Sequence, residues 1–284
     1  MNNYKSILLL KLPYCIYVEH KQDMDFMDRT NFRPLPSIAL ASICGFFDKY
    51  KSIDYTLKAI DINIEAYQNP GEPIDPSLYK DLLTNAIKDN DYGILAMSAM
   101  FLYNIRWVEL AVKLSRQYHP EAKIIIGGGY PTVFPKEAVE KHDIDFAVIG
   151  EGEAAFLHIL NKINNHTDLQ FEKSYPFENY ATKDDAGKVV VVPRKTFTGL
   201  EGLPSPNWDY LNVDKYFKNS GDRVLPMESS RGCPYTCTFC ASFLAWGRKM
   251  RYKPVDNVIA EVQQIYLKHK VSGVYFTDDN ISFS

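Results

Sequence analysis

The sequence predicts an α/β protein: a parallel β-sheet in the first part of the chain and the start of a second β/α unit near its end. Strand-length apolar segments alternate with helical patterns over residues 1–165. Turn-forming residues interrupt this alternation over 166–223, and a strand–helix–strand pattern begins again over 224–284. A chain of 284 residues is long enough for one large domain or two smaller ones, so we expect these boundaries to separate two domains and a linker.

Five segments of the first part have the character of strands, and several are nearly continuous apolar runs. Such runs are typical of parallel strands that are covered on both faces. The five segments are Ile7–Leu12, Leu57–Asn63, Ile94–Met100, Lys123–Gly128 and Phe146–Gly150. Helical stripes lie between them, for example Trp107, Ala111, Leu114 and Tyr118. We therefore expect a doubly wound, Rossmann-like or flavodoxin-like sheet of five parallel strands.

The middle and the end of the chain follow different patterns. Residues 166–223 contain Gly187 ahead of a β-branched run, Val189–Val192, which predicts a connector with a small hairpin. Val224–Glu228 then fits a strand, 255–269 a helix and Val274–Thr277 a second strand. Because a strand–helix–strand start cannot close a barrel, we expect the N-terminal piece of a longer protein, or a truncated gene product.

Composition excludes several classes of function. The 32 Lys and Arg residues nearly balance the 35 Asp and Glu residues, which argues against a binder of nucleic acid or of an anionic membrane surface. The longest apolar stretch, Ile94–Tyr103, is far shorter than the ~20 residues of a spanning helix. Lys11 interrupts the apolar run at the N-terminus, so no signal peptide is expected. We expect a cytoplasmic protein whose cysteines serve metal or redox chemistry.

Three cysteines crowd into one short segment. Cys233, Cys237 and Cys240 follow a predicted strand at spacings of four and three residues, so their thiols can meet at one soft metal centre. Three thiolates suit a four-iron cluster whose fourth iron stays open, whereas structural zinc takes four protein ligands. No His lies between residues 167 and 268 to complete a zinc site, and a disulfide would leave one thiol unpaired. The pattern favours a [4Fe–4S] cluster over both alternatives.

The segment from Arg231 to Cys240 (RGCPYTCTFC) resembles the signature of the radical S-adenosylmethionine (radical SAM) superfamily. The resemblance implies that the three cysteines hold a [4Fe–4S] cluster and that the open iron chelates S-adenosylmethionine. It also implies that reductive cleavage of S-adenosylmethionine gives a 5′-deoxyadenosyl radical, with the electron supplied by a partner such as flavodoxin or ferredoxin. We assign no catalytic side chain from the sequence.

Other residues near this segment fit the same family. The resemblance places acidic residues near the amino group of S-adenosylmethionine, which corresponds to Asp278 and Asp279 after the last predicted strand. The alternative is a polar turn that caps the next helix. Phe239 is expected to cover the cluster, to pack as an ordinary aromatic residue, or to do both.

Two glycine-rich turns follow neighbouring strands of the first part. Gly127, Gly128 and Gly129 follow the fourth strand, and Gly150-Glu151-Gly152-Glu153 follows the fifth. Both turns lie where open α/β sheets bind ligands. Taken alone, the first is also consistent with a plain tight turn, and the second with a helix start whose acidic residues suit the helix dipole.

Together with a later proline-rich lead-in, these turns resemble the cobalamin-binding module that precedes many radical SAM domains. The segments that carry the resemblance are Ile124–Pro131, Asp143–Glu153 and Leu203–Pro206. It implies a cobalamin-binding domain over 1–165 and the N-terminal part of a radical SAM domain over 224–284. It also implies that cobalamin contacts Ser98, Gly127 to Gly129, Glu151 and Gly152, although Ser98 alone would be an ordinary strand serine.

One departure concerns cobalt itself. Many cobalamin modules carry Asp-x-His-x-x-Gly after the first strand, with the His as a cobalt ligand. Here His20 has Val18 in the Asp position and Asp23 in the Gly position, so that motif is absent. Many radical SAM relatives bind cobalamin without it, and others keep the sheet without the cofactor; both alternatives stay open.

The family resemblance implies a cobalamin-dependent radical SAM enzyme, in most such cases a methyltransferase that acts on an unactivated carbon (class B type). Its substrate is expected to be a small molecule or a peptide. The alternatives are a radical cyclase, rearrangement enzyme or oxidase without methyl transfer, and a non-catalytic cobalamin-binding fragment, because a barrel cut after two strands leaves catalysis by this chain alone in doubt.

Overall fold

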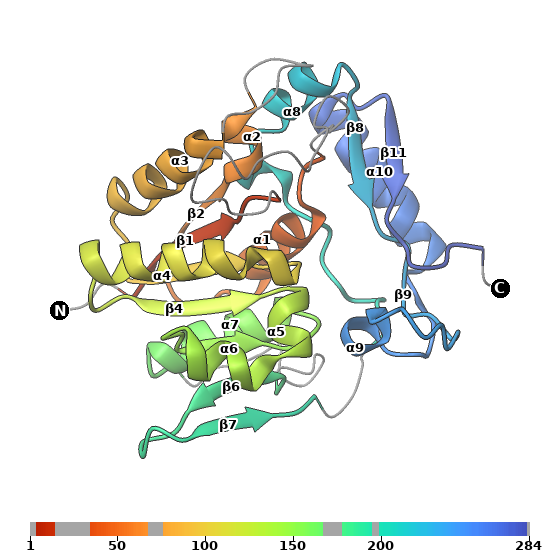
Figure 1. The fold of residues 1–284 in the computed structure, drawn as a ribbon. Helices are drawn as coiled ribbons and strands as arrows, with labels where there is room; N and C mark the ends of the chain where they lie inside the picture. Colours follow the sequence, from red (N-terminus) through yellow and green to blue (C-terminus); the bar gives the residue numbers. More distant parts are fainter. Residues whose placement is uncertain (1–3, 15–34, 68–75, 167–177, 195–198, 283–284) are drawn as a thin grey trace.

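The fold is built on one seven-stranded sheet, seen in a computed structural model (Figure 1). The structure describes residues 4–14, 35–67, 76–166, 178–194 and 199–282. The strands lie in the order β2-β1-β3-β4-β5-β6-β7. Their bounds are Ser6–Lys11 for β1, Thr56–Asp61 for β2, Ile94–Ser98 for β3, Lys123–Gly127 for β4, Phe146–Val148 for β5, Tyr180–Lys183 for β6 and Val189–Val192 for β7.

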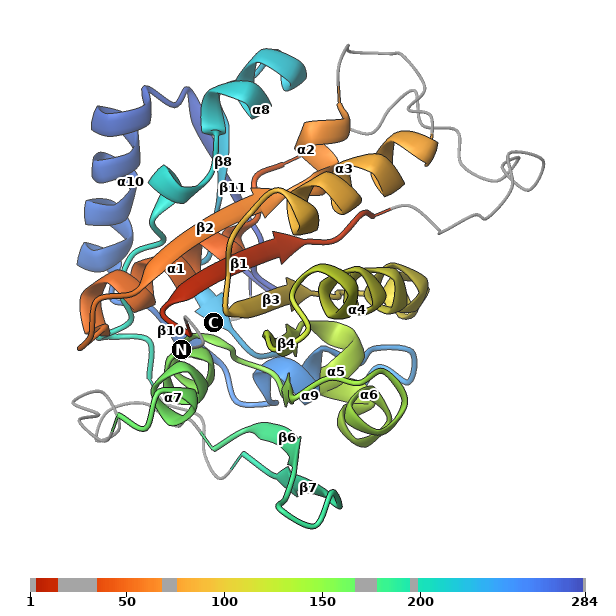
Figure 2. The ribbon, with the colours of Figure 1, turned by 90° about the vertical axis from the view of Figure 1, so that its left-hand side faces the viewer.

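The first five strands are parallel, as the sequence predicts. Within β1, which lies beside β2 in Figure 2, Ile7 and Leu9 belong to one hydrophobic cluster, and Leu8 and Leu10 to another on the opposite face. A strand buried on both faces cannot alternate apolar with polar residues, and this explains the unbroken apolar run.

Helices cover both faces of the sheet. One hydrophobic cluster includes α1 (Ile38–Tyr50) and α7 (Glu153–Ile163). The other includes α3 (Pro76–Lys88), α4 (Ile105–Tyr118) and α6 (Pro135–Lys141). The short elements α2 (Ile62–Ala66), η2 (Leu102–Asn104) and α5 (Gly129–Val133) follow β2, β3 and β4 directly. The doubly wound α/β prediction is therefore confirmed.

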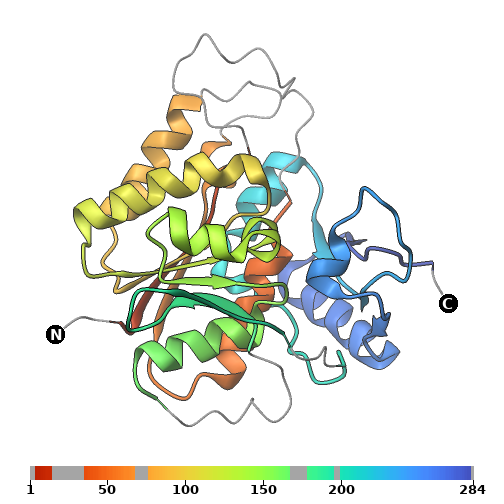
Figure 3. The ribbon, with the colours of Figure 1, turned by 60° about the horizontal axis from the view of Figure 1, so that its bottom comes forward.

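The predicted hairpin is part of the main sheet. β6 and β7 pair antiparallel around a turn in which Gly187 has φ +77°, a conformation that favours glycine. β6 also pairs antiparallel with β5, which extends the sheet by two strands (Figure 3). The sequence shows the hairpin but not this pairing, because Tyr180 and Ala181 are buried only by distant parts of the chain.

The chain then crosses α1 to reach a second unit. A Cβ atom at Gly45 of α1 would lie 2.2 Å from the Ser205 carbonyl oxygen, so the lead-in packs directly on the helix backbone. After η3 (Trp208–Tyr210) and α8 (Val213–Ser220), β8 (Val224–Met227) pairs parallel with β11 (Gly273–Phe276). Helix α10 (Val255–His269) joins them, with the bounds that the sequence predicts. Between β8 and α10 lie β9 (Ser230–Arg231), α9 (Ser242–Trp246) and β10 (Arg251–Tyr252).

Among the described residues, no helix combines the length and the apolar character needed to cross a membrane.

A partly buried histidine makes the stability of the sheet domain depend on pH. Burial in α7, together with Lys162, lowers the pKa of His158 to about 4, while Glu178 opposes the shift. The folded pKa lies below the unfolded value of about 6.5, so only the unfolded chain takes up this proton between those pH values. Allowing for partial solvent screening, we expect the free energy of unfolding to fall by about 1–2 kcal/mol from pH 7.5 to pH 5 through this group.

Urea unfolding at the two pH values, with wild type and His158→Gln, measures this contribution. The pH dependence should be weaker in the variant, and an equal dependence in both proteins would contradict the prediction.

Candidate functional site

The carboxyl ends of the parallel strands bring several predicted residues together. Ser98 ends β3 and lies in register with Gly127, the last residue of β4. Gly152 directly precedes α7 and belongs to the short loop that follows β5. Because carboxyl ends of parallel strands meet at one edge, these residues line one side of the sheet, here called the carboxyl edge.

Close backbone packing explains two of the glycines at this edge. Gly128 has φ +106°, and a Cβ atom there would lie 2.6 Å from the Ala99 carbonyl oxygen. At Gly129 the corresponding distance to the Met100 carbonyl oxygen is 2.2 Å. Both glycines therefore let the turn after β4 touch the turn after β3, whether or not a ligand is bound.

At the other two predicted glycines a Cβ atom would make only ordinary van der Waals contacts. The nearest atom to a Cβ at Gly127 would be 3.9 Å away, and at Gly152 it would be 3.8 Å away. Both residues are partly exposed, so a ligand can approach the backbone at these two points. Partly exposed backbone at these two glycines fits a large flat ligand bound at the carboxyl edge.

The same edge exposes apolar side chains. Met100, Phe101 and Leu102 follow β3, and Val133 and Phe134 follow β4; all are at least 36% exposed. Helix α5 contacts both η2 and α9, so these side chains stand on elements that touch one another (Figure 1). Apolar surface of this kind is typical of a binding site for a mostly apolar ligand.

One threonine ties the two glycine turns together. The Thr132 hydroxyl donates a hydrogen bond to the Gly128 carbonyl at 2.6 Å and accepts one from the Gly150 amide at 2.8 Å. The side chain is buried, so both bonds are shielded from water. The sequence gives no signal for this link, because threonine in a helix rarely indicates a contact with a turn 18 residues away.

The three predicted cluster ligands lie on one loop, Gly232–Ala241, here called the thiol loop. Cys237 is exposed, Cys233 and Cys240 are partly exposed, and all three are free thiols. Phe239 is 91% exposed and covers no described residue closely. Within the described part of the chain, no group of three or more His, Cys, Asp or Glu side chains is arranged to hold a metal ion. The thiol loop thus has the donors for a soft metal, and ligation by the three cysteines stays a prediction.

Hydrogen bonds at the end of the thiol loop favour a thiolate. The Ser242 backbone amide donates to Cys240 Sγ at 3.5 Å, and the Ser242 hydroxyl lies 3.2 Å from the same sulfur. These interactions with Ser242 lower the pKa of Cys240. Because metals bind the thiolate form, this residue suits a ligand.

The two predicted acidic residues have different surroundings. Asp278 accepts hydrogen bonds from the Ser229 amide at 3.1 Å, from the Ser229 hydroxyl at 2.8 Å and from the Ser230 hydroxyl. It thereby ties the end of β11 to the segment between β8 and β9. Asp279 is more exposed; desolvation raises its pKa, and a hydrogen bond with Ser242 opposes the rise. Asp279 therefore lies near the thiol loop with its carboxylate accessible.

Sequence reasoning missed a group of buried charges between the thiol loop and the carboxyl edge. The Arg231 guanidinium donates to Glu153 at 2.6 Å, to Glu228 at 2.7 Å and to Glu151 at 3.2 Å. Arg251 donates to both oxygens of Glu151, and Arg194 lies 3.8 Å from it. We call this group the Arg231 cluster; its members are Glu151, Glu153, Arg194, Glu228, Arg231 and Arg251. Its only signals in the sequence are the Arg before the cysteines and the two Glu residues after β5.

Charge pairing opposes the effect of burial on the pKa values of Arg231 and Glu153. Burial alone would lower the pKa of Arg231, but its three carboxylates outweigh burial and raise that pKa well above its usual range. Burial would raise the pKa of Glu153, yet Arg231 outweighs it and the pKa is lowered. The pKa of Glu228 is raised, because burial and the nearby Glu153 charge exceed the effect of Arg231.

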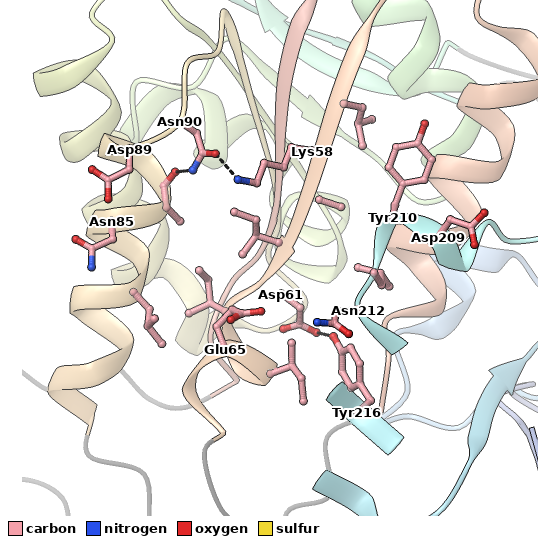
Figure 4. A pocket seen from close by; sticks show the side chains of 18 residues that line it. Lys58, Asp61, Glu65, Asn85, Asp89, Asn90, Asp209, Tyr210, Asn212 and Tyr216 are labelled. Atoms are coloured by element: carbon pink, nitrogen blue, oxygen red, sulfur yellow. Dashed lines mark hydrogen bonds between the residues drawn. The ribbon is translucent and has the colours of Figure 1, made fainter. Parts of the chain in front are cut away.

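A groove of about 740 Å³ lies elsewhere, along β2, the outermost strand of the sheet order (Figure 4). Lys58 and Asp61 of β2 line it together with Glu65, Asp209 and Tyr210. Asp61 itself is buried, 3.1 Å from Lys11 Nζ, and accepts a hydrogen bond from the Tyr216 hydroxyl at 2.6 Å. Asp61 therefore serves to attach α8 to the sheet, and none of the predicted site residues lines this groove.

The segment in which a cobalt-ligating histidine is sought, with Val18, His20 and Asp23, lies outside the described residues. Cys15 lies there as well.

The chain is similar to several known proteins. A model of the B12 binding domain family matches residues 34–160. Cytidylyl-2-hydroxyethylphosphonate methyltransferase of Streptomyces wedmorensis is 27% identical over 281 residues, which cover 86% of this chain and 51% of that protein. An anaerobic magnesium-protoporphyrin IX monomethyl ester cyclase of Rubrivivax gelatinosus is 27% identical over 175 residues, or 60% of this chain and 31% of the cyclase. The chain thus spans about half the length of the first relative.

The fold is also similar to a solved structure. The cobalamin-dependent S-adenosylmethionine radical enzyme OxsB, solved with aqua-cobalamin and S-adenosylmethionine bound, superposes with a TM-score of 0.69 at 17% identity. The match covers 96% of this chain and 34% of OxsB. At this identity the similarity establishes the fold.

The Thr132 link between the glycine turns can be tested by substitution. Thr132→Val keeps the shape but leaves the Gly150 amide without its buried acceptor, so we expect a loss of about 1–3 kcal/mol in the free energy of unfolding. Thr132→Ser keeps the hydroxyl and should retain more of that free energy. Chemical denaturation of the three proteins measures both effects, and equal stability of the Val and Ser variants would disprove the role of the hydroxyl.

Proposed function

We propose, from the match of residues 34–160 to the B12 binding domain family and from the RGCPYTCTFC segment, that this chain binds cobalamin at the carboxyl edge and a [4Fe–4S] cluster with S-adenosylmethionine at the thiol loop. The observation that carries the proposal is that Arg231 and Arg251, which flank the segment with the thiol loop, pair with Glu151 and Glu153 after β5 at the carboxyl edge. Two cofactors that share one reaction must lie close together, and this arrangement supports that requirement.

The cobalamin part of the proposal rests on the space at the carboxyl edge. Gly127 and Gly152 are partly exposed, and exposed apolar side chains stand on the segments that follow β3 and β4, namely Met100, Phe101 and Phe134. Ser98 supplies a hydroxyl at the same edge. Gly128 and Gly129 would contribute backbone atoms, since their own Cβ positions are filled by the turn after β3. A ring system with polar side groups suits such a mixture of apolar side chains and accessible backbone.

The cluster part rests on the donors of the thiol loop. Cys233, Cys237 and Cys240 would hold the [4Fe–4S] cluster, and Ser242 would donate hydrogen bonds to the Cys240 sulfur. Asp279 is the accessible carboxylate for the amino group of S-adenosylmethionine, whereas Asp278 holds β11 in place. Phe239, fully reachable from solvent, would cover the bound group.

When bound, these cofactors would supply a 5′-deoxyadenosyl radical and a transferable methyl group. The chain's own residues would orient the two cofactors and exclude water between them. We propose methyl transfer to an unactivated carbon of a small molecule or peptide, with reducing equivalents from a flavodoxin or ferredoxin. The similarity to the Streptomyces wedmorensis methyltransferase favours methyl transfer.

A second candidate is radical chemistry without methyl transfer, which the similarity to the Rubrivivax gelatinosus cyclase favours. The two candidates differ in the fate of S-adenosylmethionine. Methyl transfer consumes a second molecule as methyl donor and forms S-adenosylhomocysteine, whereas a cyclase forms none.

Cobalamin binding is tested by anaerobic loading with hydroxocobalamin, desalting and a visible absorption spectrum. We expect retention near one per chain, and at least about tenfold weaker binding for Gly127→Val and Gly152→Val, because each side chain enters the open space at the carboxyl edge. Gly273→Val, in β11, is the matched control and should bind as wild type does. A folded wild-type chain that retains no corrin would refute the cobalamin part.

Cluster binding is tested by anaerobic reconstitution with iron and sulfide. Each of the single variants Cys233→Ala, Cys237→Ala and Cys240→Ala should lose most of the bound iron, because three ligands hold the cluster. Each should also lose the thiolate-to-iron charge-transfer absorption. Cys44→Ala is the control, since Cys44 is a buried thiol of α1. Wild-type iron content in all three thiol-loop variants would disprove the assignment.

A further inference from the structure

Glu151 lies close to three arginines, of which one precedes the thiol loop, one follows it and one comes from the segment after β7. Arg231, which precedes the loop, donates to Glu151 Oε2 at 3.2 Å. Arg251, which follows the loop, donates to the same oxygen at 3.2 Å and to Oε1. Arg194, from the segment after β7, lies 3.8 Å from Oε1. One carboxylate at the carboxyl edge therefore faces guanidinium groups from three separate segments.

Two of these arginines, Arg194 and Arg251, also donate hydrogen bonds to the last carbonyl groups of α9, the helix that follows the thiol loop. Arg194 donates to the carbonyl oxygens of Leu244 and Ala245, each at 2.8 Å. Arg251 donates to the Trp246 carbonyl at 2.9 Å. Carbonyls at a helix C-terminus lack partners inside the helix and carry partial negative charge, so guanidinium groups satisfy them well. The far end of the thiol loop is thus fixed to the group that Glu151 holds.

The near end of the loop is fixed in the same place. Arg231 is 4% exposed and directly precedes Gly232. Gly232 has φ +97°, and a Cβ atom there would lie 2.4 Å from the Lys249 carbonyl oxygen, so the start of the thiol loop is in close contact with the segment that follows α9. Arg231 also stacks on the Trp246 ring, with the guanidinium carbon 4.8 Å from the ring centre. Both ends of the loop therefore meet at the Arg231 cluster.

We propose that Glu151 is a positioning residue: its carboxylate holds the two ends of the thiol loop against the carboxyl edge and so sets the separation between the cluster and cobalamin. This inference rests on the proposed function for its two cofactors, but its mechanical part concerns the chain alone. Glu151 then acts through Arg231 and Arg251, and its side-chain oxygens are occupied by them instead of by the corrin.

Asp145 offers a matched control on the other end of the same strand. Asp145 directly precedes β5, whereas Glu151 follows that strand. The Asp145 carboxylate also faces two cations. Lys123 lies 2.8 Å and Arg116 lies 3.3 Å from Asp145 oxygens. Asp145→Asn and Glu151→Gln each remove one charge without a change of shape, at opposite ends of the sheet.

The first measurement is hydrogen–deuterium exchange of the intact protein without cofactors. Glu151→Gln should speed exchange of the amides in 232–249 by at least about fivefold, because local opening becomes easier, while Asp145→Asn leaves them at wild-type rates. If Glu151→Gln does not fold, the charge-balanced double variant Arg231→Met/Glu153→Gln should show the same change. Wild-type exchange of 232–249 in a folded variant would overturn the inference, whatever the cofactor content.

The second measurement is spectroscopic and uses the protein loaded with both cofactors. In wild type, pulsed electron paramagnetic resonance between cob(II)alamin and the reduced cluster should give one narrow distance distribution, and Glu151→Gln should broaden it while both cofactors stay bound. An unchanged distribution would overturn the inference. A loss of cobalamin affinity of tenfold or more without faster loop exchange would also overturn it, because it would show that Glu151 contacts the corrin. Absence of either cofactor from wild type would instead refute the proposed function.

Discussion

Carboxylates at the end of a buried strand meet guanidinium groups from a different part of the chain, and the relation between the two units depends on this meeting. Arg231 bridges Glu151 and Glu153, which follow β5, to Glu228, which follows β8. Charges so far from water are tolerated only where their partners are complete. The three carboxylates and three guanidinium groups of the Arg231 cluster therefore favour the seating of the second unit in which these charges meet.

The sheet determines what the Arg231 cluster can reach. Parallel strands covered on both faces place all their carboxyl ends at one edge, and short turns follow there. Tight turns at Gly128 and Gly129 bring the segments after β3 and β4 into contact, and Thr132 joins them to the turn after β5. The turns of the carboxyl edge are therefore joined to one another, and the turn after β5 lies against α9, because a Cβ atom at Gly150 would be 2.9 Å from the Ala245 carbonyl oxygen.

Patterns among neighbouring residues predicted the strands and helices that local interactions determine. The five parallel strands follow from apolar runs such as Ile94–Ser98, and α10 follows from a stripe of apolar residues that ends before Gly273. The pairing of β6 with β5 was missed, since a two-strand hairpin carries no information about its neighbour in the sheet. The Arg231 cluster was missed for the same reason: Glu151 and Arg251 are 100 residues apart, and only the folded chain shows that they meet. Asp278 was predicted beside a ligand, and its hydrogen bonds to Ser229 give it a second role that no spacing rule indicates.

The outer strand β2 has a consequence for association between copies of the protein. An exposed strand edge is a template for unwanted pairing with another chain, and proteins commonly guard such edges with lysine. Lys58 stands in the middle of β2 with its amine hydrogen-bonded to Asn90, and residues of α3 and η3 line the groove together with the strand (Figure 4). A flat sheet from another molecule would have to bury that charge and enter the groove. The architecture therefore keeps an open sheet edge with a low tendency to aggregate.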